Sequence, residues 1–305
     1  MSSADSPKTV HGVLTAAAAF LAAAGVEEPR RSCDLLMARL LGCKPLQLCF
    51  RFDEPLAPQR LAAMRRGVKR LAAHEPVQYI LGEWEFLGHP IKVDARALIP
   101  RPETEGLVQQ ALEEDAIWNG GETLVVDLGT GSGCIAASVA LAKPAARVVA
   151  LDVSAAALAL AEENARALGV AERIAFSDRD IGDVLEPGQA GVLIANLPYV
   201  PTAEYEKLPL HIRDYEPRQA LDGGDDGLRV IRDAVADAAV VLADGGRIFL
   251  EIDRRQADAV RDLLSQAGFG DVTVTQDLGG RDRVVRAVMK GEDEWQEAGK
   301  NSSLS

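Results

Sequence analysis

Apolar side chains near the N-terminus recur at the spacing of amphipathic helices. Between Val10 and Ala24 they return every three or four residues, which places them on one face of a helix, and Gly25 ends the run. A second helical pattern covers 33–41, and a third begins at Pro58, a residue favoured in the first turn of a helix. The pattern therefore predicts a small helical domain over residues 1–75.

A different pattern follows between Val77 and Val93, where β-branched and aromatic residues flank the turn sequence of residues 87–90. β-Branched and aromatic residues favour strands, and Gly and Pro favour turns, so we expect a hairpin here. The hairpin belongs to a predicted linker over residues 76–101.

From residue 102 onward, short apolar runs alternate with longer amphipathic ones. Alternating strands and helices form right-handed crossovers, so the expected fold is α/β, with a mostly parallel sheet covered by helices on both faces. The last two strands are expected to pair antiparallel at one edge. The seven predicted strands cover 123–128, 147–151, 173–177, 192–195, 247–252, 272–275 and 284–289. This second domain spans 102–290, and the polar residues 291–305 are expected to form a flexible tail.

Composition and charge narrow the class of protein. The chain has 305 residues, of which 48% are hydrophobic, which is enough for a buried core and too many for a disordered chain. Its net charge of −13 argues against a protein that coats nucleic acid, so we expect no stable nucleic-acid partner. The charge is uneven, because residues 1–101 carry 14 Lys and Arg against 10 Asp and Glu, a balance of +4, which leaves −17 for the rest. The basic positions between Arg60 and Arg70 are either a solvated helix face or a surface for a protein partner.

Cysteine usage and hydropathy indicate a cytoplasmic protein. Cys33, Cys43, Cys49 and Cys134 form no Cys-x-x-Cys pair and have no histidine at metal-ligand spacing, so we expect reduced core thiols and no metal site. The most apolar stretch, 14–26, is too short to span a bilayer, and no basic segment precedes it as in a signal peptide. We therefore expect a cytoplasmic protein without membrane contact. Separately, we expect it to be a monomer.

A glycine-rich turn directly follows the first strand of the predicted sheet. Its residues are Asp127, Gly129, Thr130, Gly131, Ser132 and Gly133. Glycines allow a sharp turn and let a ligand approach the backbone, and the next strand ends in Asp152, whose carboxylate can accept hydrogen bonds from ribose hydroxyls. The arrangement predicts a nucleoside cofactor, and the alternative is a tight turn without a ligand.

The acid in this turn favours one class of cofactor. Dinucleotide sites place a pyrophosphate at the helix N-terminus and usually show Gly-x-Gly-x-x-Gly, whereas Asp127 would repel a phosphate and suits a cation. S-adenosylmethionine carries a sulfonium and an ammonium group and no phosphate, so it is the predicted cofactor. Asp180 and Ile181, which follow the third strand, are further candidates for contact with its adenine. Asp180 is equally well explained as an exposed loop carboxylate.

The fourth strand ends at Asn196-Leu197-Pro198-Tyr199, at the edge where open α/β sheets place their chemistry. An amide or exocyclic base nitrogen is a poor nucleophile because its lone pair is delocalised. The Asn196 side-chain oxygen and the Leu197 backbone carbonyl can both accept hydrogen bonds from such an NH₂ group, and these bonds strengthen as positive charge develops during methylation. Pro198 is expected to fix the turn and Tyr199 to lie over the planar group. We predict these four residues as catalytic, with Asn196 also beside the cofactor, and the alternative is a plain strand-ending turn.

Together these residues resemble the release factor glutamine methyltransferases of the HemK/PrmC type. Besides the cofactor turn and residues 196–199, the resemblance rests on EPVQYILG at 75–82, EFLG at 85–88, LIPRPETE at 98–105 and YEPRQALDGG at 215–224. It implies a class I S-adenosylmethionine-dependent methyltransferase with a Rossmann-like sheet. The expected reaction is methylation of the side-chain amide N5 of the glutamine in the Gly-Gly-Gln motif of peptide-chain release factors. The resemblance also implies that the N-terminal helical domain helps to dock this protein substrate.

One residue departs from the family pattern, which usually reads Asn-Pro-Pro-Tyr where this chain has Leu197. The backbone carbonyl is retained, but the rigidity of the loop is put in question. Asn-Leu-Pro-Tyr is also similar to the tip of ribosomal RNA adenine dimethyltransferases, so methylation of a base amine in RNA or DNA is an alternative. A closer rival is the related glutamine methyltransferase of a large-subunit ribosomal protein, and a third hypothesis is a noncatalytic module that retains the cofactor fold.

Overall fold

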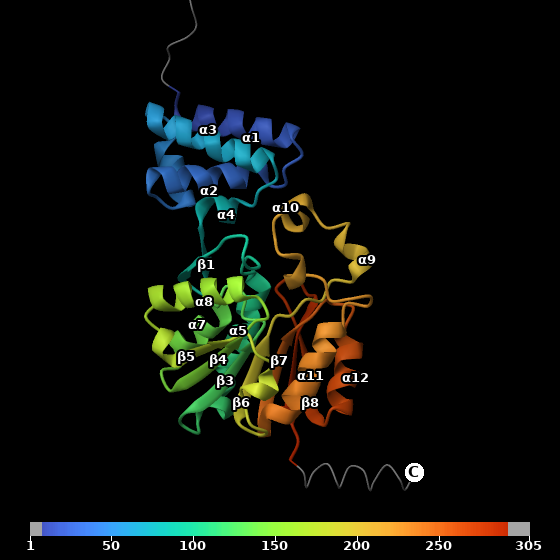
Figure 1. The fold of residues 1–305 in the computed structure, drawn as a ribbon. Coiled ribbons are helices and arrows are strands. Elements are labelled where there is room, and N and C mark those ends of the chain that lie inside the picture. The colour runs from blue at the N-terminus through green and yellow to red at the C-terminus, as the bar shows by residue number, and fades with distance from the viewer. Residues whose placement is uncertain (1–7, 292–305) are drawn as a thin grey trace, which may run out of the picture. The chain divides into compact units, whose positions relative to one another are not determined.

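The computed structural model describes residues 8–291, which divide into two compact units (Figure 1). Unit 1 comprises the chain up to Glu83 together with 209–215, and unit 2 comprises 84–208 and the chain from Glu216 onward. The predicted tail, 291–305, lies outside the described residues except for Gly291. Within the described part of the chain, no helix has both the length and the apolar character needed to cross a membrane.

Unit 1 is a small group of helices around its own apolar core. The core includes Leu14, Leu21, Met37, Met64 and Leu71, each at most 2% exposed. The helices are α1 Val10–Ala23, α2 Pro29–Leu41, the 3-10 helix η1 Pro45–Arg51, α3 Pro58–Ala72 and α4 Val77–Leu81. The three helices predicted from periodicity are therefore present, and the second begins earlier than predicted because a proline occupies its first turn.

Residues 77–81 form the short helix α4, where the sequence pattern predicted a strand. Pro76 precedes this helix, and Gly82 ends it with a φ angle of 73°, a left-handed conformation that favours glycine. Val77 packs into the core of unit 1, and this packing outweighs the preference of a β-branched residue for a strand. The hairpin is correspondingly shorter than predicted, with β1 Glu83–Phe86 and β2 His89–Lys92.

A short segment from the middle of the chain also belongs to unit 1. It contains α10, Leu210–Arg213, and the Tyr215 hydroxyl donates a hydrogen bond to the Ala73 carbonyl oxygen at 2.6 Å. The sequence pattern assigned this segment to the second domain, 102–290, and four residues are too few to show helical periodicity. The chain therefore leaves unit 2 after Leu208 and returns to it at Glu216.

Unit 2 contains a seven-stranded sheet in the order β5-β4-β3-β6-β7-β9-β8. The first five strands in this order are parallel, and β9 runs antiparallel to both β7 and β8, which confirms the expected antiparallel edge. The strands are β3 Thr123–Leu128, β4 Ala146–Leu151, β5 Ile174–Ser177, β6 Ala190–Ala195, β7 Leu242–Glu251, β8 Phe269–Gln276 and β9 Asp282–Met289. The predicted mostly parallel α/β fold is confirmed.

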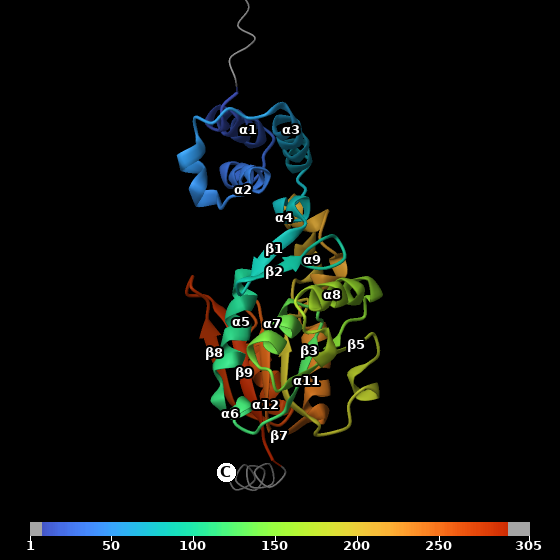
Figure 2. The same cartoon turned by 90° about the vertical axis from the view of Figure 1, so that its left-hand side faces the viewer.

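Helices cover both faces of this sheet, with α5, α7 and α8 on one face and α11 and α12 on the other (Figures 1 and 2). Val126, Leu193 and Phe249 are fully buried, as expected for strands covered on both faces. The helices are α5 Pro102–Glu113, α6 Asp115–Trp118, α7 Cys134–Ala142, α8 Ala155–Ala167, α9 Thr202–Tyr205, α11 Arg229–Val241 and α12 Ala257–Gln266, with 3-10 turns η2 Ala171–Arg173, η3 Ile181–Asp183 and η4 Arg218–Ala220.

The four cysteines of the chain are free thiols, as predicted. Cys33 and Cys134 are buried and Cys43 is half-buried. The expectation of a core thiol is wrong for Cys49, which is exposed on η1 because this short 3-10 helix buries little besides Leu48.

The strand order determines where a ligand site forms in unit 2. The chain adds β4 and β5 on one side of β3 and then adds β6 on its other side, so the order of strand addition reverses between β3 and β6, which run parallel. The loops that follow these two strands therefore separate at their carboxyl ends, and open α/β sheets bind ligands in such a crevice. The glycine turn follows β3, and residues 196–199 follow β6.

Candidate active site

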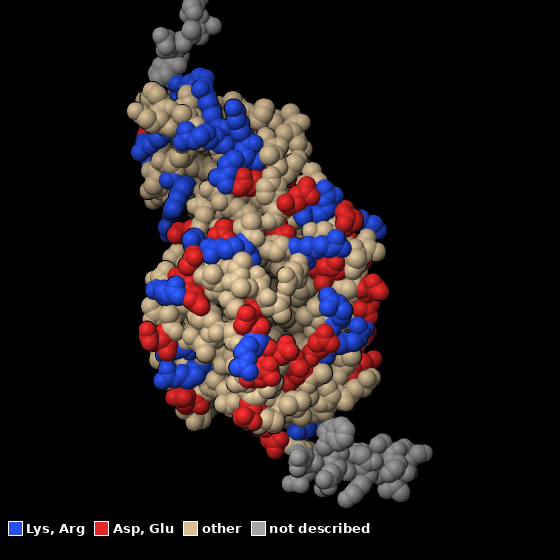
Figure 3. Space-filling view, viewed as in Figure 1, with Lys and Arg blue, Asp and Glu red and all other residues tan. Residues whose placement is uncertain are grey.

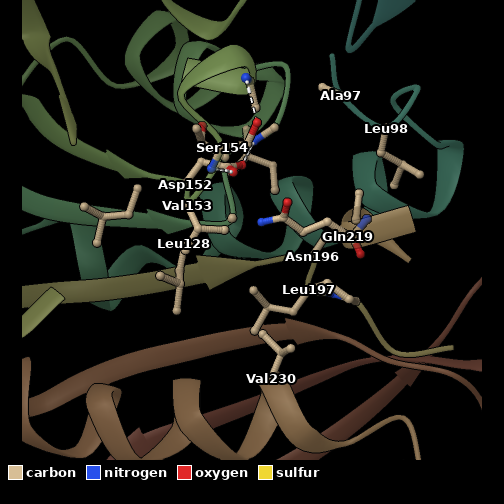
Figure 4. Close-up of a pocket in the computed structure, with 18 of the residues that line it drawn as sticks. Ala97, Leu98, Leu128, Asp152, Val153, Ser154, Asn196, Leu197, Gln219 and Val230 are labelled. Atoms are coloured by element: carbon tan, nitrogen blue, oxygen red, sulfur yellow. Dashed lines mark hydrogen bonds between the residues drawn. The ribbon is translucent and has the colours of Figure 1, made fainter. Parts of the chain in front are cut away.

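A cavity of about 430 Å³ lies at the carboxyl ends of β3, β4 and β6. Figure 4 shows Asn196 extending from the end of β6 into the space between Asp152, at the end of β4, and Gln219. Further walls come from the segments 96–101, 179–181 and 217–220 and from one face of α11. All of these segments belong to unit 2, so the cavity is complete within that unit.

The glycine turn is held in place by the carboxylate of Asp152. Gly129 and Gly131 have φ angles of 74° and 56°, which glycine adopts at little cost. The Asp152 Oδ2 accepts a hydrogen bond from the Gly131 N–H, and its Oδ1 accepts one from the Ser154 N–H, each at 2.9 Å (Figure 4). Burial raises the pKa of Asp152. A carboxylate has about four acceptor sites, so Asp152 retains capacity for the hydroxyl groups of a ligand.

Asp127 lies beneath the glycine turn, which differs from the expectation that it contacts a ligand. Its side chain is fully buried, and Oδ2 accepts hydrogen bonds from the Thr130 hydroxyl at 2.6 Å and from the Ala136 N–H at 3.0 Å. Burial raises the pKa of Asp127 to about 7. These two hydrogen bonds join the turn to the start of α7. Asp127, near the end of a buried strand, does not line the cavity.

Gly133 also lies outside the cavity, at the point where the turn meets α8. It has a φ angle of 77°, and an added Cβ would lie 2.8 Å from the Cβ of Ala161. No side chain fits into this contact without displacing α8. The turn therefore faces the cavity through residues 129–132, and Asp127 and Gly133 anchor its two ends.

Asn196 is connected to two buried polar residues. Its Nδ2 donates a hydrogen bond to the Thr104 Oγ1 at 2.9 Å, and the Thr104 hydroxyl donates one to the Glu251 Oε2 at 2.6 Å. Thr104 comes from α5, and Glu251 is the last residue of β7. Burial raises the pKa of Glu251. With Nδ2 bound to Thr104, the Asn196 Oδ1 is the group left to accept a hydrogen bond from a substrate.

Tyr199 does not line the cavity, so the expectation that its ring lies over a planar substrate group is not supported. Its hydroxyl donates a hydrogen bond to the Glu251 Oε1 at 3.3 Å, and burial raises the pKa of the phenol. A largely buried tyrosine needs a partner for its hydroxyl, and Glu251 provides one. Leu197 and Pro198 do line the cavity, and the Leu197 side chain is 4% exposed within the core of unit 2.

The strand-ending residues 196–199 pack against the glycine-containing loop that precedes α11. An added Cβ on Gly223 would lie 2.6 Å from the Pro198 carbonyl oxygen, and one on Gly227 would overlap the Tyr199 carbonyl oxygen. The Gln256 Nε2 donates hydrogen bonds to the Tyr199 and Gly227 carbonyls, each at 3.1 Å. This loop therefore supports the backbone around Asn196.

Two walls of the cavity are joined by the buried carboxylate of Glu216. Its Oε2 accepts a hydrogen bond from the Ile99 N–H at 3.0 Å, and its Oε1 accepts one from the Arg101 guanidinium. The Glu216 side chain is completely buried, and that of Arg101 is 27% exposed. The motifs at 98–105 and 215–224, far apart in sequence, thus form one wall of the same site.

Comparison with known proteins identifies the family. Models of the PrmC N-terminal domain and of the methyltransferase small domain match residues 12–82 and 106–208. The chain is 40% identical to the release factor glutamine methyltransferase of Geobacter sulfurreducens over 277 residues, which cover 91% of this chain and 95% of the relative. It is 36% identical to the human MTRF1L release factor glutamine methyltransferase, over 88% of this chain and 83% of the relative. The chain belongs to the release factor glutamine methyltransferase family.

A solved structure shares the fold of this family member. The match to a methyltransferase from Pyrococcus furiosus has a TM-score of 0.50 and 15% identity, and it covers 67% of this chain and 91% of that one. At this identity the likeness concerns the fold alone, and it agrees with the predicted methyltransferase architecture.

In this methyltransferase, most of the predicted site residues surround one cavity. They are Gly129, Thr130, Gly131, Ser132, Asp152, Asp180, Ile181, Asn196, Leu197 and Pro198, whereas Asp127, Gly133 and Tyr199 lie outside its lining. Thr104 and Glu251 were not predicted as site residues, because each is a polar residue within an otherwise regular pattern. Asp233 and Asp237 were not predicted either, although their four-residue spacing on α11 indicates a shared face. Desolvation, followed by the charges of Asp233 and Asp180, raises the pKa of Asp237.

Proposed function

We propose that this chain methylates the side-chain amide N5 of the glutamine in the Gly-Gly-Gln motif of peptide-chain release factors, with S-adenosylmethionine as the methyl donor. The proposal rests on the placement of Asn196, with its amide nitrogen bound to Thr104, in the same cavity as the glycine turn and Asp152. Membership of the family supports release factors as the substrate class. The proposed enzyme acts in the cytoplasm as a monomer and forms no stable complex with nucleic acid.

The residues around the cavity suit S-adenosylmethionine better than a nucleotide with a phosphate group. The Gly131 N–H, which at a dinucleotide site is available to the phosphate, is already donated to Asp152. Asp152 and Asp180 offer acceptors for ribose hydroxyls and an adenine amine, and Ile181 offers an apolar surface. When bound, S-adenosylmethionine supplies an electrophilic methyl group.

Asn196 and Leu197 orient the substrate amide and stabilise its developing charge. In the proposed reaction, the Asn196 Oδ1 and the Leu197 carbonyl accept hydrogen bonds from the glutamine NH₂ group, which directs the nitrogen lone pair out of conjugation and toward the methyl group. Both hydrogen bonds strengthen as the nitrogen becomes positive, so they bind the transition state more tightly than the ground state. The cationic amide loses its proton readily, so the site needs no strong general base.

A basic groove on unit 1 is the proposed docking surface for the release factor. The groove lies between α1 and α3, has a volume of about 580 Å³, and combines an apolar floor that includes Met64 with the basic residues Arg65, Arg66 and Lys69. Figure 3 shows Lys and Arg side chains gathered on one face of this unit. Charge reversal at the three basic positions is expected to weaken release-factor binding by at least about tenfold. Arg261→Glu on α12 is the control, and unchanged binding of the triple variant would exclude this surface.

The decisive test supplies purified enzyme with labelled S-adenosylmethionine and three substrates together: a release factor, large-subunit ribosomal proteins and RNA. Label on the glutamine of the Gly-Gly-Gln peptide, located by mass spectrometry, supports the proposal. Label confined to a ribosomal protein or to RNA would replace it with one of the two rival methyltransferase functions.

Replacing Asn196 tests whether the site is catalytic. Asn196→Ala is expected to lower kcat by about 10²–10³-fold while calorimetry shows nearly unchanged cofactor affinity, because its carbonyl group acts on the transition state. Asn119→Ala, at an exposed loop position, is the matched control. Wild-type activity in Asn196→Ala would contradict the proposed mechanism.

A further inference from the structure

We propose that Thr104 and Glu251 are positioning residues that fix the side-chain amide of Asn196 in the orientation needed for methyl transfer. The inference rests on the proposed function, in which the Asn196 Oδ1 accepts a hydrogen bond from the substrate. Thr104 contacts Asn196 directly, and Glu251 acts through Thr104.

The chemistry of the three groups gives their hydrogen bonds one direction. The Thr104 hydroxyl has a single hydrogen, and it is donated to the Glu251 Oε2. The lone pairs that remain on the Thr104 oxygen can only accept, and they accept from the Asn196 Nδ2. A reversed amide would place the Asn196 Oδ1 against an oxygen that has no hydrogen to offer. The Asn196 Oδ1 is therefore the atom left for the substrate.

The surroundings of Glu251 support its role as a hydrogen-bond acceptor. The residue is 1% exposed, and the Tyr199 hydroxyl donates to its second oxygen at 3.3 Å. Burial raises the pKa of Glu251, whereas the Thr104 hydrogen bond and the charge of Arg283 lower it, and the charge of Glu103 raises it. Both carboxyl oxygens of Glu251 are thus occupied by hydroxyl donors.

A merely structural role explains these residues poorly. Thr104 is 2% exposed, and apolar side chains of similar volume would fill the space between α5 and the end of β7. Burying a carboxylate costs free energy that hydrogen bonds offset only in part, so an apolar pair would be at least as stabilising. An apolar pair, however, offers no hydrogen-bond acceptor to fix the orientation of the Asn196 amide.

The first test removes the Thr104 hydroxyl without changing the volume of the side chain. Thr104→Val is expected to lower kcat by about 10- to 100-fold, since a displaced catalytic group loses on the order of 100-fold in rate. Cofactor affinity, measured by calorimetry, and the KM for the release factor should stay within about threefold, whereas Thr104→Ser should restore kcat to within about threefold of wild type. Thr123→Val is the matched control, because the buried Thr123 hydroxyl donates to the Ile117 carbonyl at 3.0 Å, away from the cavity.

The second test does not depend on methyl transfer. In ¹⁵N-labelled protein, the side-chain NH₂ group of Asn196, assigned by its loss in Asn196→Ala, should exchange with solvent more slowly than the exposed amide of Asn119. Thr104→Val should accelerate this exchange, and Thr123→Val should not. Glu251→Gln should accelerate it as well, because the new amide can donate to Thr104 and release the hydroxyl hydrogen toward Asn196.

Three results would overturn the inference: wild-type kcat in Thr104→Val, no recovery in Thr104→Ser, or an Asn196 amide whose exchange is unchanged in both variants. If the wild-type enzyme transfers no methyl group to release factors, the proposed function fails, and the exchange measurement still decides whether Thr104 orients Asn196. If circular dichroism shows that Thr104→Val is unfolded, Glu251→Gln carries the same comparisons.

Discussion

Replacing Gly133 with alanine tests whether the close approach between the glycine turn and α8 is what requires glycine at this position. Gly133 has a φ angle of 77°, and an added Cβ would lie 2.8 Å from the Cβ and 2.9 Å from the Cα of Ala161. Such distances are far inside van der Waals contact, so either the turn or α8 must move.

Gly131→Ala is the matched control, because it shares the backbone conformation without the clash. Gly131 has a φ angle of 56°, and the nearest atoms to an added Cβ are 3.9 Å away. Left-handed backbone costs an alanine about 1–2 kcal/mol, and overpacking adds about 1–3 kcal/mol. We therefore expect the free energy of unfolding to fall by about 1–2 kcal/mol in Gly131→Ala and by about 2–5 kcal/mol in Gly133→Ala.

Urea unfolding of both variants and the wild type measures this difference. The free energy of unfolding is obtained by linear extrapolation, and coinciding transitions in circular dichroism and fluorescence establish that the comparison is valid. Equal destabilisation of the two variants, within about 0.5 kcal/mol, would show that the turn and α8 separate freely, and it would refute the role assigned to the Gly133 contact.

Three further substitutions test the carboxylates around the cavity. Folding raises the pKa of Asp127 from 3.8 to about 7. The contribution of Asp127 to the free energy of unfolding is therefore fully present below pH 4 and is lost as the pH rises through 7. Urea unfolding between pH 4 and pH 8 should therefore show the wild type losing stability relative to Asp127→Asn, by at most about 4 kcal/mol. Asp152→Ala should weaken S-adenosylmethionine binding in calorimetry by about 10-fold or more, and the exposed Asp178→Ala should not. Glu216→Gln should lower the free energy of unfolding by about 1–3 kcal/mol, measured with urea, because Arg101 loses its charged partner.

The architecture of unit 2 could be predicted from the sequence because its strands are buried on both faces. The strand at 123–128 is a short apolar run that ends at a glycine turn, and the structure has the same bounds. Open α/β sheets bind ligands at the carboxyl ends of their parallel strands, which predicts that Asp152 and Asn196 lie near one another. Both residues line the cavity.

The errors come from segments whose conformation depends on distant contacts. Residues 77–81 have the composition of a strand, but they form a helix that packs Val77, Ile80 and Leu81 against the core of unit 1. Residues 209–215 carry too few positions to show any period. The link between Thr104 and Glu251 was equally invisible, because 147 positions separate them and each stands alone in its pattern.

Three buried carboxylates lie behind the segments that form the cavity. Asp127 holds the glycine turn, Glu251 binds the hydroxyl beside Asn196, and Glu216 joins two walls, and each residue is at most 4% exposed. Burying a carboxylate is costly, so stability alone does not explain three of them in one site. Each of the three accepts hydrogen bonds from the groups around it, and these contacts hold the donors in a fixed orientation around the ligand. Part of the −17 charge that follows residue 101 therefore determines the geometry of the site, in contrast to the exposed basic residues of α3.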